Sequence, residues 1–201
     1  MHALDGDRVP TPDTAGRRVL LTLLALNGVM CVAEVAGGWA AESMGLVADG
    51  LDMGADAAVY LLALLAIGAS DRRKLGAARF AGRVQLLLAV GAIIEVARRG
   101  IVGSAPEPPT MVGLSLVALI VNAACVALLR RHRDGEIHLQ AAWIFSATDV
   151  QANLGVIAAG LLVGWFNSPI PDLVVGAIVS GLVLRGALRI RRRVRLSEAG
   201  G

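Results

Sequence analysis

The stretch ADGLDMGAD, residues 48–56, places three aspartates inside a long apolar run. An α-helix turns by about 100° per residue, so the spacings of three and four bring Asp49, Asp52 and Asp56 onto one face. A charged side chain at mid-membrane costs about 2.5 to 3.5 kcal/mol on insertion scales. We therefore expect this face to serve a purpose other than packing.

The composition of the whole chain is typical of an integral membrane protein. Hydrophobic residues make up 56% of the 201 residues and charged residues only 17%. Six apolar runs approach the length of about 20 residues that a bilayer-spanning helix needs. The sequence therefore predicts an all-α fold, a bundle of six transmembrane helices at residues 19–40, 43–69, 79–102, 111–129, 139–165 and 170–190.

Both ends of the chain are expected in the cytoplasm. All of the 19 basic residues except Arg98 and Arg99 lie before the first predicted helix, between the second and third or at the start of the third, after the fourth, or at the end of the sixth. Basic residues in short loops favour the cytoplasmic side. Residues 1–18 are predicted to be a disordered tail and residues 191–201 a short basic tail, with no soluble domain. The net charge of +3 reflects this asymmetry, and we expect contact with lipid but not with nucleic acid.

Acidic and amide side chains from two predicted helices should meet near mid-membrane. Asp149 and Asn153 are four residues apart, so they share a face at about the depth of Asp52 and Asp56. Clustered carboxylates at this depth indicate a bound cation. The alternative is a set of neutral carboxylic acids that hydrogen-bond inside the bundle. Further candidates for an accessory role, or for simple interhelical hydrogen bonds or snorkelling, are Asp49, Glu34 and Asn27.

Four segments together resemble the cation diffusion facilitator family. SMGLVADGLDMGAD resembles its second helix, where a [His/Asp]-x-x-x-Asp pair corresponds to Asp52 and Asp56. AAWIFSATDVQANLGVIAAGLLV resembles its fifth helix, whose second such pair ends at Asp149. NGVMCVAEVAGGWAAES and PDLVVGAIVSGLVLRGALRI resemble the first and sixth helices. The resemblance covers residues 19–195 and implies a divalent metal efflux transporter of the bacterial inner membrane, with a homodimeric assembly.

One position departs from the family pattern. Phe145 stands where the second pair usually begins with His or Asp, and phenylalanine cannot ligate a metal. Either the carbonyl oxygen of Asn153 or the carboxylate of Asp49 could take its place. Oxygen ligands suit manganese or magnesium. The resemblance instead implies zinc, cobalt, cadmium or iron, so the transported ion stays open; no resident cofactor is expected.

Three function classes fit the aspartate pattern. In the first, a cation binds to Asp52, Asp56 and Asp149, and the helices expose it alternately to each side. Because ligation needs deprotonated carboxylates, metal and protons should compete, which predicts proton-coupled antiport. In the second, D-x-x-D-x-x-x-D is the magnesium–diphosphate motif of a membrane prenyltransferase-like enzyme, but Ala48 stands where those enzymes usually have Asn. In the third, the chain is a pore-like or non-transporting structural membrane protein. The first class is preferred, so the chain is not expected to be an enzyme.

Overall fold

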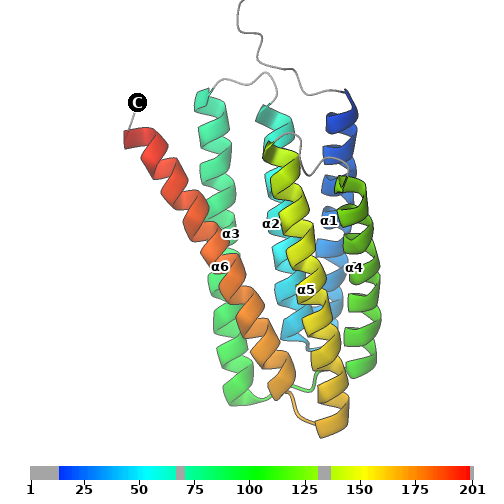
Figure 1. The fold of residues 1–201 in the computed structure, drawn as a ribbon. Coiled ribbons are helices and arrows are strands. Elements are labelled where there is room, and N and C mark those ends of the chain that lie inside the picture. Colours follow the sequence, from blue (N-terminus) through cyan, green and yellow to red (C-terminus); the bar gives the residue numbers. More distant parts are fainter. Residues whose placement is uncertain (1–13, 67–70, 131–136, 200–201) are drawn as a thin grey trace, which may run out of the picture.

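The computed structural model describes residues 14–66, 71–130 and 137–199, and these form six α-helices. They are α1 (Thr14–Ala40), α2 (Met44–Ala66), α3 (Asp71–Val102), α4 (Pro108–Leu129), α5 (Ile137–Phe166) and α6 (Ile170–Ala199). The predicted all-α fold is confirmed. In Figure 1 the helices alternate in direction, so that α1 begins and α6 ends at the same end of the bundle, here called the terminal end. The opposite end, where α1 joins α2, α3 joins α4 and α5 joins α6, is called the loop end.

Five of the six described helices are long and apolar enough to cross a bilayer. The chain is therefore an integral, multi-pass membrane protein. The exception is α2, which has the necessary length of 23 residues but carries three aspartates. Composition and length alone thus support a membrane span for five of the six predicted helices. The sixth depends on its surroundings in the bundle.

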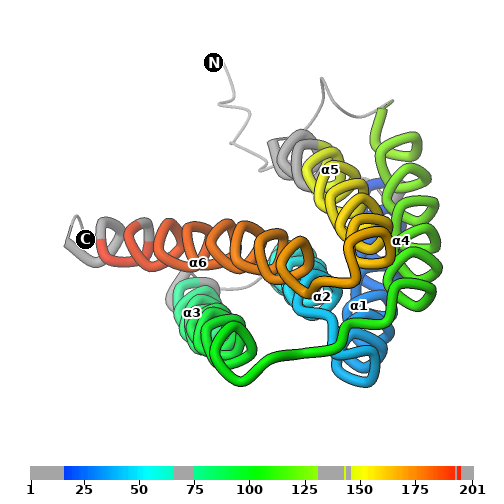
Figure 2. The backbone as a smooth tube through the Cα atoms, turned by 90° about the horizontal axis from the view of Figure 1, so that it is seen from below, coloured from blue at the N-terminus to red at the C-terminus, as the bar shows by residue number. Residues whose placement is uncertain are grey.

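Those surroundings place α2 in the middle of the bundle. It contacts each of the other five helices, and Figure 2 shows it between the α3–α6 pair and the group formed by α1, α4 and α5. Glycines permit the closest approach, to α1: a methyl group on Gly50 would lie 2.9 Å from the Val35 nitrogen, and one on Gly38 would lie 2.8 Å from the Val47 nitrogen. The central position turns the polar face of α2 toward protein.

A buried carboxylate fastens the start of α2 to α6 at the loop end. Asp172 accepts hydrogen bonds from the Ser43 hydroxyl (2.6 Å), the Met44 nitrogen (2.7 Å) and the Gly45 nitrogen (2.9 Å). Backbone N–H groups in the first turn of a helix have no partners within it, and negative charge is favourable there. Gly176 lets the two helices touch, since a methyl group on it would lie 2.8 Å from the Met44 Cβ. This contact fixes the depth and rotation of α2.

Several predicted boundaries were wrong because helices continue past their apolar segments. The helix α1 already begins at Thr14, inside the predicted tail 1–18, and α6 runs to Ala199 through most of the predicted tail 191–201. The helix α3 starts at Asp71, eight residues before the predicted start at residue 79. Arginine and lysine are good helix formers, so these charged extensions stay helical. Residues 1–13, and the end of the predicted helix 43–69, lie outside the described residues.

Candidate functional site

The acidic residues predicted to converge are neighbours between α2 and α5. Asp149 is 2% exposed and Asp56 8%, whereas Asp52 is half-buried. The charges that act on Asp149 come from Asp56, Asp52, Asp49 and Glu34. Three helices, α1, α2 and α5, therefore direct five carboxyl groups toward one region of the interior.

Most of these carboxyl groups have at least one oxygen without a hydrogen-bond donor. Within the described part of the chain, one oxygen each of Asp49, Asp56 and Asp149 has no hydrogen-bond partner, and the only hydrogen-bonding partner of the buried Glu34 carboxyl group is another carboxyl group, that of Asp49. Buried polar atoms normally have partners, because an unsatisfied one loses its hydration without compensation. A cation or a proton is the partner that such oxygens require.

A second polar group lies toward the loop end from Asp56. The Asn153 amide donates to Asp49 over 2.5 Å, and the Asn122 amide donates to the Asn153 oxygen over 3.0 Å. All three side chains are fully buried, and the Glu34 carboxyl group is a direct electrostatic neighbour of Asp49. We call Glu34, Asp49, Asn122 and Asn153 the amide network. It joins four helices, α1, α2, α4 and α5.

The amide network contains both residues that were expected to replace the ligand missing at Phe145. The two residues expected to substitute for it, Asn153 and Asp49, are hydrogen-bonded to each other, and the Asn153 oxygen already accepts from Asn122. Asp49 keeps one oxygen without a partner in the described segments, so it could bind a metal and still accept from Asn153. The Phe145 side chain itself lies outside the described residues.

The remaining accessory candidate, Asn27, is buried but faces a different partner. Its amide donates to the Leu23 carbonyl of its own helix over 3.0 Å. Its oxygen has no partner in the described segments. The described contacts therefore do not tie Asn27 to the acidic residues, and its accessory role stays a prediction.

Sequence reasoning missed two residues beside the carboxylates. Tyr60 is 1% exposed, and its electrostatic neighbours include Asp56, Asp149 and Cys125. Ser146 is fully buried as well. Helical spacing could have identified both, because Tyr60 follows Asp56 by four residues and Ser146 precedes Asp149 by three.

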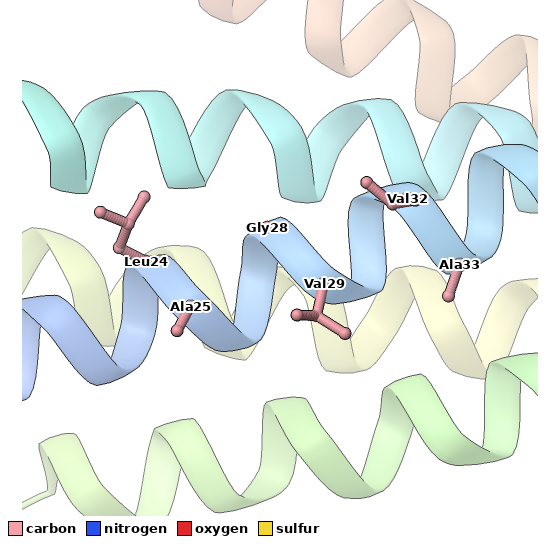
Figure 3. Close-up of a pocket in the computed structure, with 6 residues that line it drawn as sticks. All are labelled: Leu24, Ala25, Gly28, Val29, Val32 and Ala33. Atoms are coloured by element: carbon pink, nitrogen blue, oxygen red, sulfur yellow. The ribbon is translucent and has the colours of Figure 1, made fainter.

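The carboxylates do not form a finished metal site as they stand. Within residues 14–66, 71–130 and 137–199, no group of three or more acidic, histidine or cysteine side chains is close enough to hold a metal ion. Side-chain rotation on α2 and α5 would be needed for shared ligation. An apolar groove along α1, drawn in Figure 3, lies elsewhere and has no acidic lining; its residues are Leu24, Ala25, Gly28, Val29, Val32 and Ala33.

Comparison with known proteins identifies relatives over nearly the whole chain. The family model of the cation efflux transmembrane domain matches residues 20–196. The zinc transporter ZitB of Yersinia pestis is 28% identical over 194 residues, which cover 89% of this chain and 61% of ZitB. The metal cation efflux system protein CzcD of Cupriavidus metallidurans is 28% identical over 174 residues, which cover 78% of this chain and 55% of CzcD.

A third relative carries an exchange activity in its name. The cadmium, cobalt and zinc/H(+)-K(+) antiporter of Bacillus velezensis is 25% identical over 190 residues, 87% of this chain and 60% of the relative. The chain thus spans between 55% and 61% of the length of these three relatives.

Proposed function

This chain belongs to the cation efflux family, and from that premise we propose that it exports divalent metal cations, with Asp52, Asp56 and Asp149 as ligands. The observation that carries the proposal is the group of buried carboxyl oxygens without donors between α2 and α5. Divalent cations bind to carboxylate oxygens, and mutual repulsion among these groups would be relieved by such an ion.

The cargo is a first-row or related divalent metal. The names of the relatives include zinc, cobalt and cadmium, so we propose these ions first as the cargo. Iron and manganese are also candidates, because the proposed ligands Asp52, Asp56 and Asp149, with Asn153 as a fourth, all offer oxygen. A fourth ligand could come from the second lone pair of the Asn153 oxygen or from the Asp49 oxygen that has no partner among the described residues.

Proton antiport is the proposed source of energy. The carboxylates must be deprotonated to bind metal, so binding releases any protons that they carry. In a buried site the empty carboxylates repel each other and favour protonation. Metal and protons would then occupy the same groups in turn while α2 and α5 expose them to opposite sides.

The assembly proposed is a homodimer in the bacterial inner membrane, with both chain ends in the cytoplasm. Membership of the family supports the dimer, and the bacterial relatives support the location. Large apolar side chains are exposed on the outer faces of the helices and suit contact with lipid; they include Phe80, Leu87, Ile94 and Ile101 on α3.

Transport is favoured over the enzyme with an aspartate-rich motif. The first aspartate of that motif, Asp49, is fully buried and bound to the Asn153 amide. A diphosphate with its magnesium needs an accessible site, whereas a single ion needs only a few oxygens. Family membership supports the same choice.

Metal movement in vesicles containing the purified chain tests the proposal. Zinc, cobalt, cadmium, iron and manganese should be compared, with and without an imposed pH gradient. We expect metal to move against the direction of proton flow, and metal addition should release protons from detergent-solubilised protein. Both signals should vanish when Asp52, Asp56 and Asp149 are all replaced by alanine. Metal flux that does not respond to the pH gradient, with no proton release on metal binding, would rule out antiport. A uniporter or a channel would then be the better description.

A further inference from the structure

An apolar cluster packs between α1, α2 and α4 on the terminal-end side of Asp56. Its buried members are each at most 1% exposed and come from α1, α2 and α4: Leu20, Leu23, Tyr60, Cys125 and Leu129. Partly buried side chains pack around them, among them Trp143 from α5. We call the five buried residues the terminal plug.

Tyr60 connects the terminal plug to the carboxylates. The helix α2 runs from the loop end to the terminal end, so Tyr60 lies one turn, about 6 Å, beyond Asp56 toward the terminal end. Tyr60 has the largest side chain among the fully buried residues that the structure describes. Its ring packs with the plug while its hydroxyl is an electrostatic neighbour of Asp56 and Asp149.

The terminal plug is a barrier for an ion that approaches from the terminal end. A divalent cation keeps a tightly bound hydration shell, and an apolar constriction excludes both the water and the ion. No charged side chain belongs to the plug as described. An ion therefore cannot reach Asp56 by this route while the ring of Tyr60 stays in place.

The hydroxyl of Tyr60 is the second observation. It lies beside the carboxyl group of Asp56 and the hydroxyl of Ser146, and both interact with it as hydrogen-bonding groups. A buried tyrosine hydroxyl usually has such partners. Phenylalanine would fill the same space without these contacts, so the hydroxyl couples the position of the ring to the carboxylates.

We propose that Tyr60 is a positioning residue that closes the route between Asp56 and the terminal end, and that its ring must leave the terminal plug before a divalent cation can pass. The closure follows from the packing of the plug. The link to metal rests on the proposed function, in which Asp56 is a ligand.

The native Cys125 provides the test, because it is fully buried in the same plug. The full chain has two cysteines, so Cys31→Ala leaves Cys125 as the single thiol. A membrane-impermeant maleimide is added to right-side-out and to inverted membrane vesicles, and the rate of labelling is measured from each side. Labelling follows the population of molecules in which the plug is open.

Three variants of the Cys31→Ala protein distinguish closure of the route by Tyr60 from a general loosening of the helix bundle. We expect Tyr60→Ala to be labelled at least about tenfold faster from the terminal-end side only, because labelling tracks the opened population. Tyr60→Phe keeps the ring and should match the parent. Met53→Ala is the matched control, since Met53 is fully buried on the same helix but on the loop-end side of Asp56, and it should also match the parent. Where Tyr60→Ala does not fold, Tyr60→Leu takes its place, with accelerated labelling again expected.

Labelling that is no faster in Tyr60→Ala or Tyr60→Leu would overturn the proposal, and so would equal acceleration in Met53→Ala. Metal flux through the unaltered chain is measured separately. Normal flux with unchanged labelling would reject the role of Tyr60 alone. Absent flux with the expected labelling would reject metal transport but support closure by Tyr60.

Discussion

Asp172 at the loop end and Asp149 in mid-bundle are buried to nearly the same extent but have opposite surroundings. Asp172 receives three hydrogen bonds from the start of α2, at 2.6 to 2.9 Å. Asp149 keeps an oxygen without any partner in the described part of the chain, and other carboxyl groups surround it. Burial alone therefore does not distinguish a structural carboxylate from a functional one; the supply of donors does.

The difference has a physical consequence for substitution. Removing Asp172 leaves helix N–H groups buried without acceptors, so stability should suffer. Asp56 and Asp149 each have an oxygen that no donor among the described residues compensates, so removing either group should leave stability largely intact while a ligand is lost. The following experiments test this contrast, beginning with the largest expected effect.

Replacing Asp56 or Asp149 by asparagine should reduce metal flux in vesicles to the background of empty vesicles. The amide keeps the size of the side chain but removes the charge and one ligand oxygen. The unfolding temperature in detergent should stay unchanged or rise, because a buried carboxyl oxygen without a donor has been removed. Normal flux in Asp56→Asn would show that the proposed ligand set is wrong.

The matched change at the loop end, Asp172→Asn, should have the opposite profile. An amide nitrogen would face the Met44 or Gly45 nitrogen in place of an acceptor, which should lower the free energy of unfolding by about 2 kcal/mol. Denaturation in detergent measures this loss. Metal flux per folded molecule should be retained. A variant with full stability but no flux would instead indicate that Asp172 takes part in transport.

Phe145→His should change which metal is preferred. An imidazole one turn before Asp149 restores a nitrogen ligand, which suits zinc better than manganese. The ratio of zinc to manganese flux should rise by about tenfold if the new contact contributes about 1.4 kcal/mol. Ile144→His is the control, because the adjacent residue points about 100° away around the helix. An unchanged ratio in an active Phe145→His variant would place residue 145 away from the ion.

The smallest effect is expected in the amide network. Asn122→Ala removes the hydrogen bond to the Asn153 oxygen, and such bonds within membrane bundles average about 0.6 kcal/mol. The unfolding free energy should fall by about that amount. Because the Asn153 oxygen becomes free, metal affinity should not decrease; a large loss of affinity would mean that Asn122 itself binds the ion.

The sequence predicted the features that depend on periodicity and composition. Apolar runs located all six helices, and the spacing of Asp52, Asp56 and Asp149 located the carboxylates that the structure brings together. The helix ends were less predictable, because charged segments such as residues 191–199 stay helical beyond the apolar part. Hydropathy marks the end of the bilayer, not the end of the helix.

Contacts between distant segments could not be read from periodicity. Asp172 and Ser43 are 129 residues apart, and only the packing of α6 on α2 brings them together. The pairing of Asn153 with Asp49 likewise depends on how α5 is rotated relative to α2. The pattern of polar residues along a single helix does not determine that rotation. Tyr60 was within reach of helical spacing, but a tyrosine in an apolar run is usually a core residue and gave no signal by itself.

The central aspartate-bearing helix also constrains how the chain is made. Because α2 lacks the apolar composition of the other five described helices, partition into lipid by itself would be unfavourable during synthesis. Only the short segment Ala41–Ser43 separates it from α1, against which its glycines pack closely. We therefore expect α1 and α2 to enter the bilayer together as a helical hairpin, with the apolar first helix compensating for the acidic second one. In this way the residues proposed for the ion make α2 dependent on its neighbour during biogenesis.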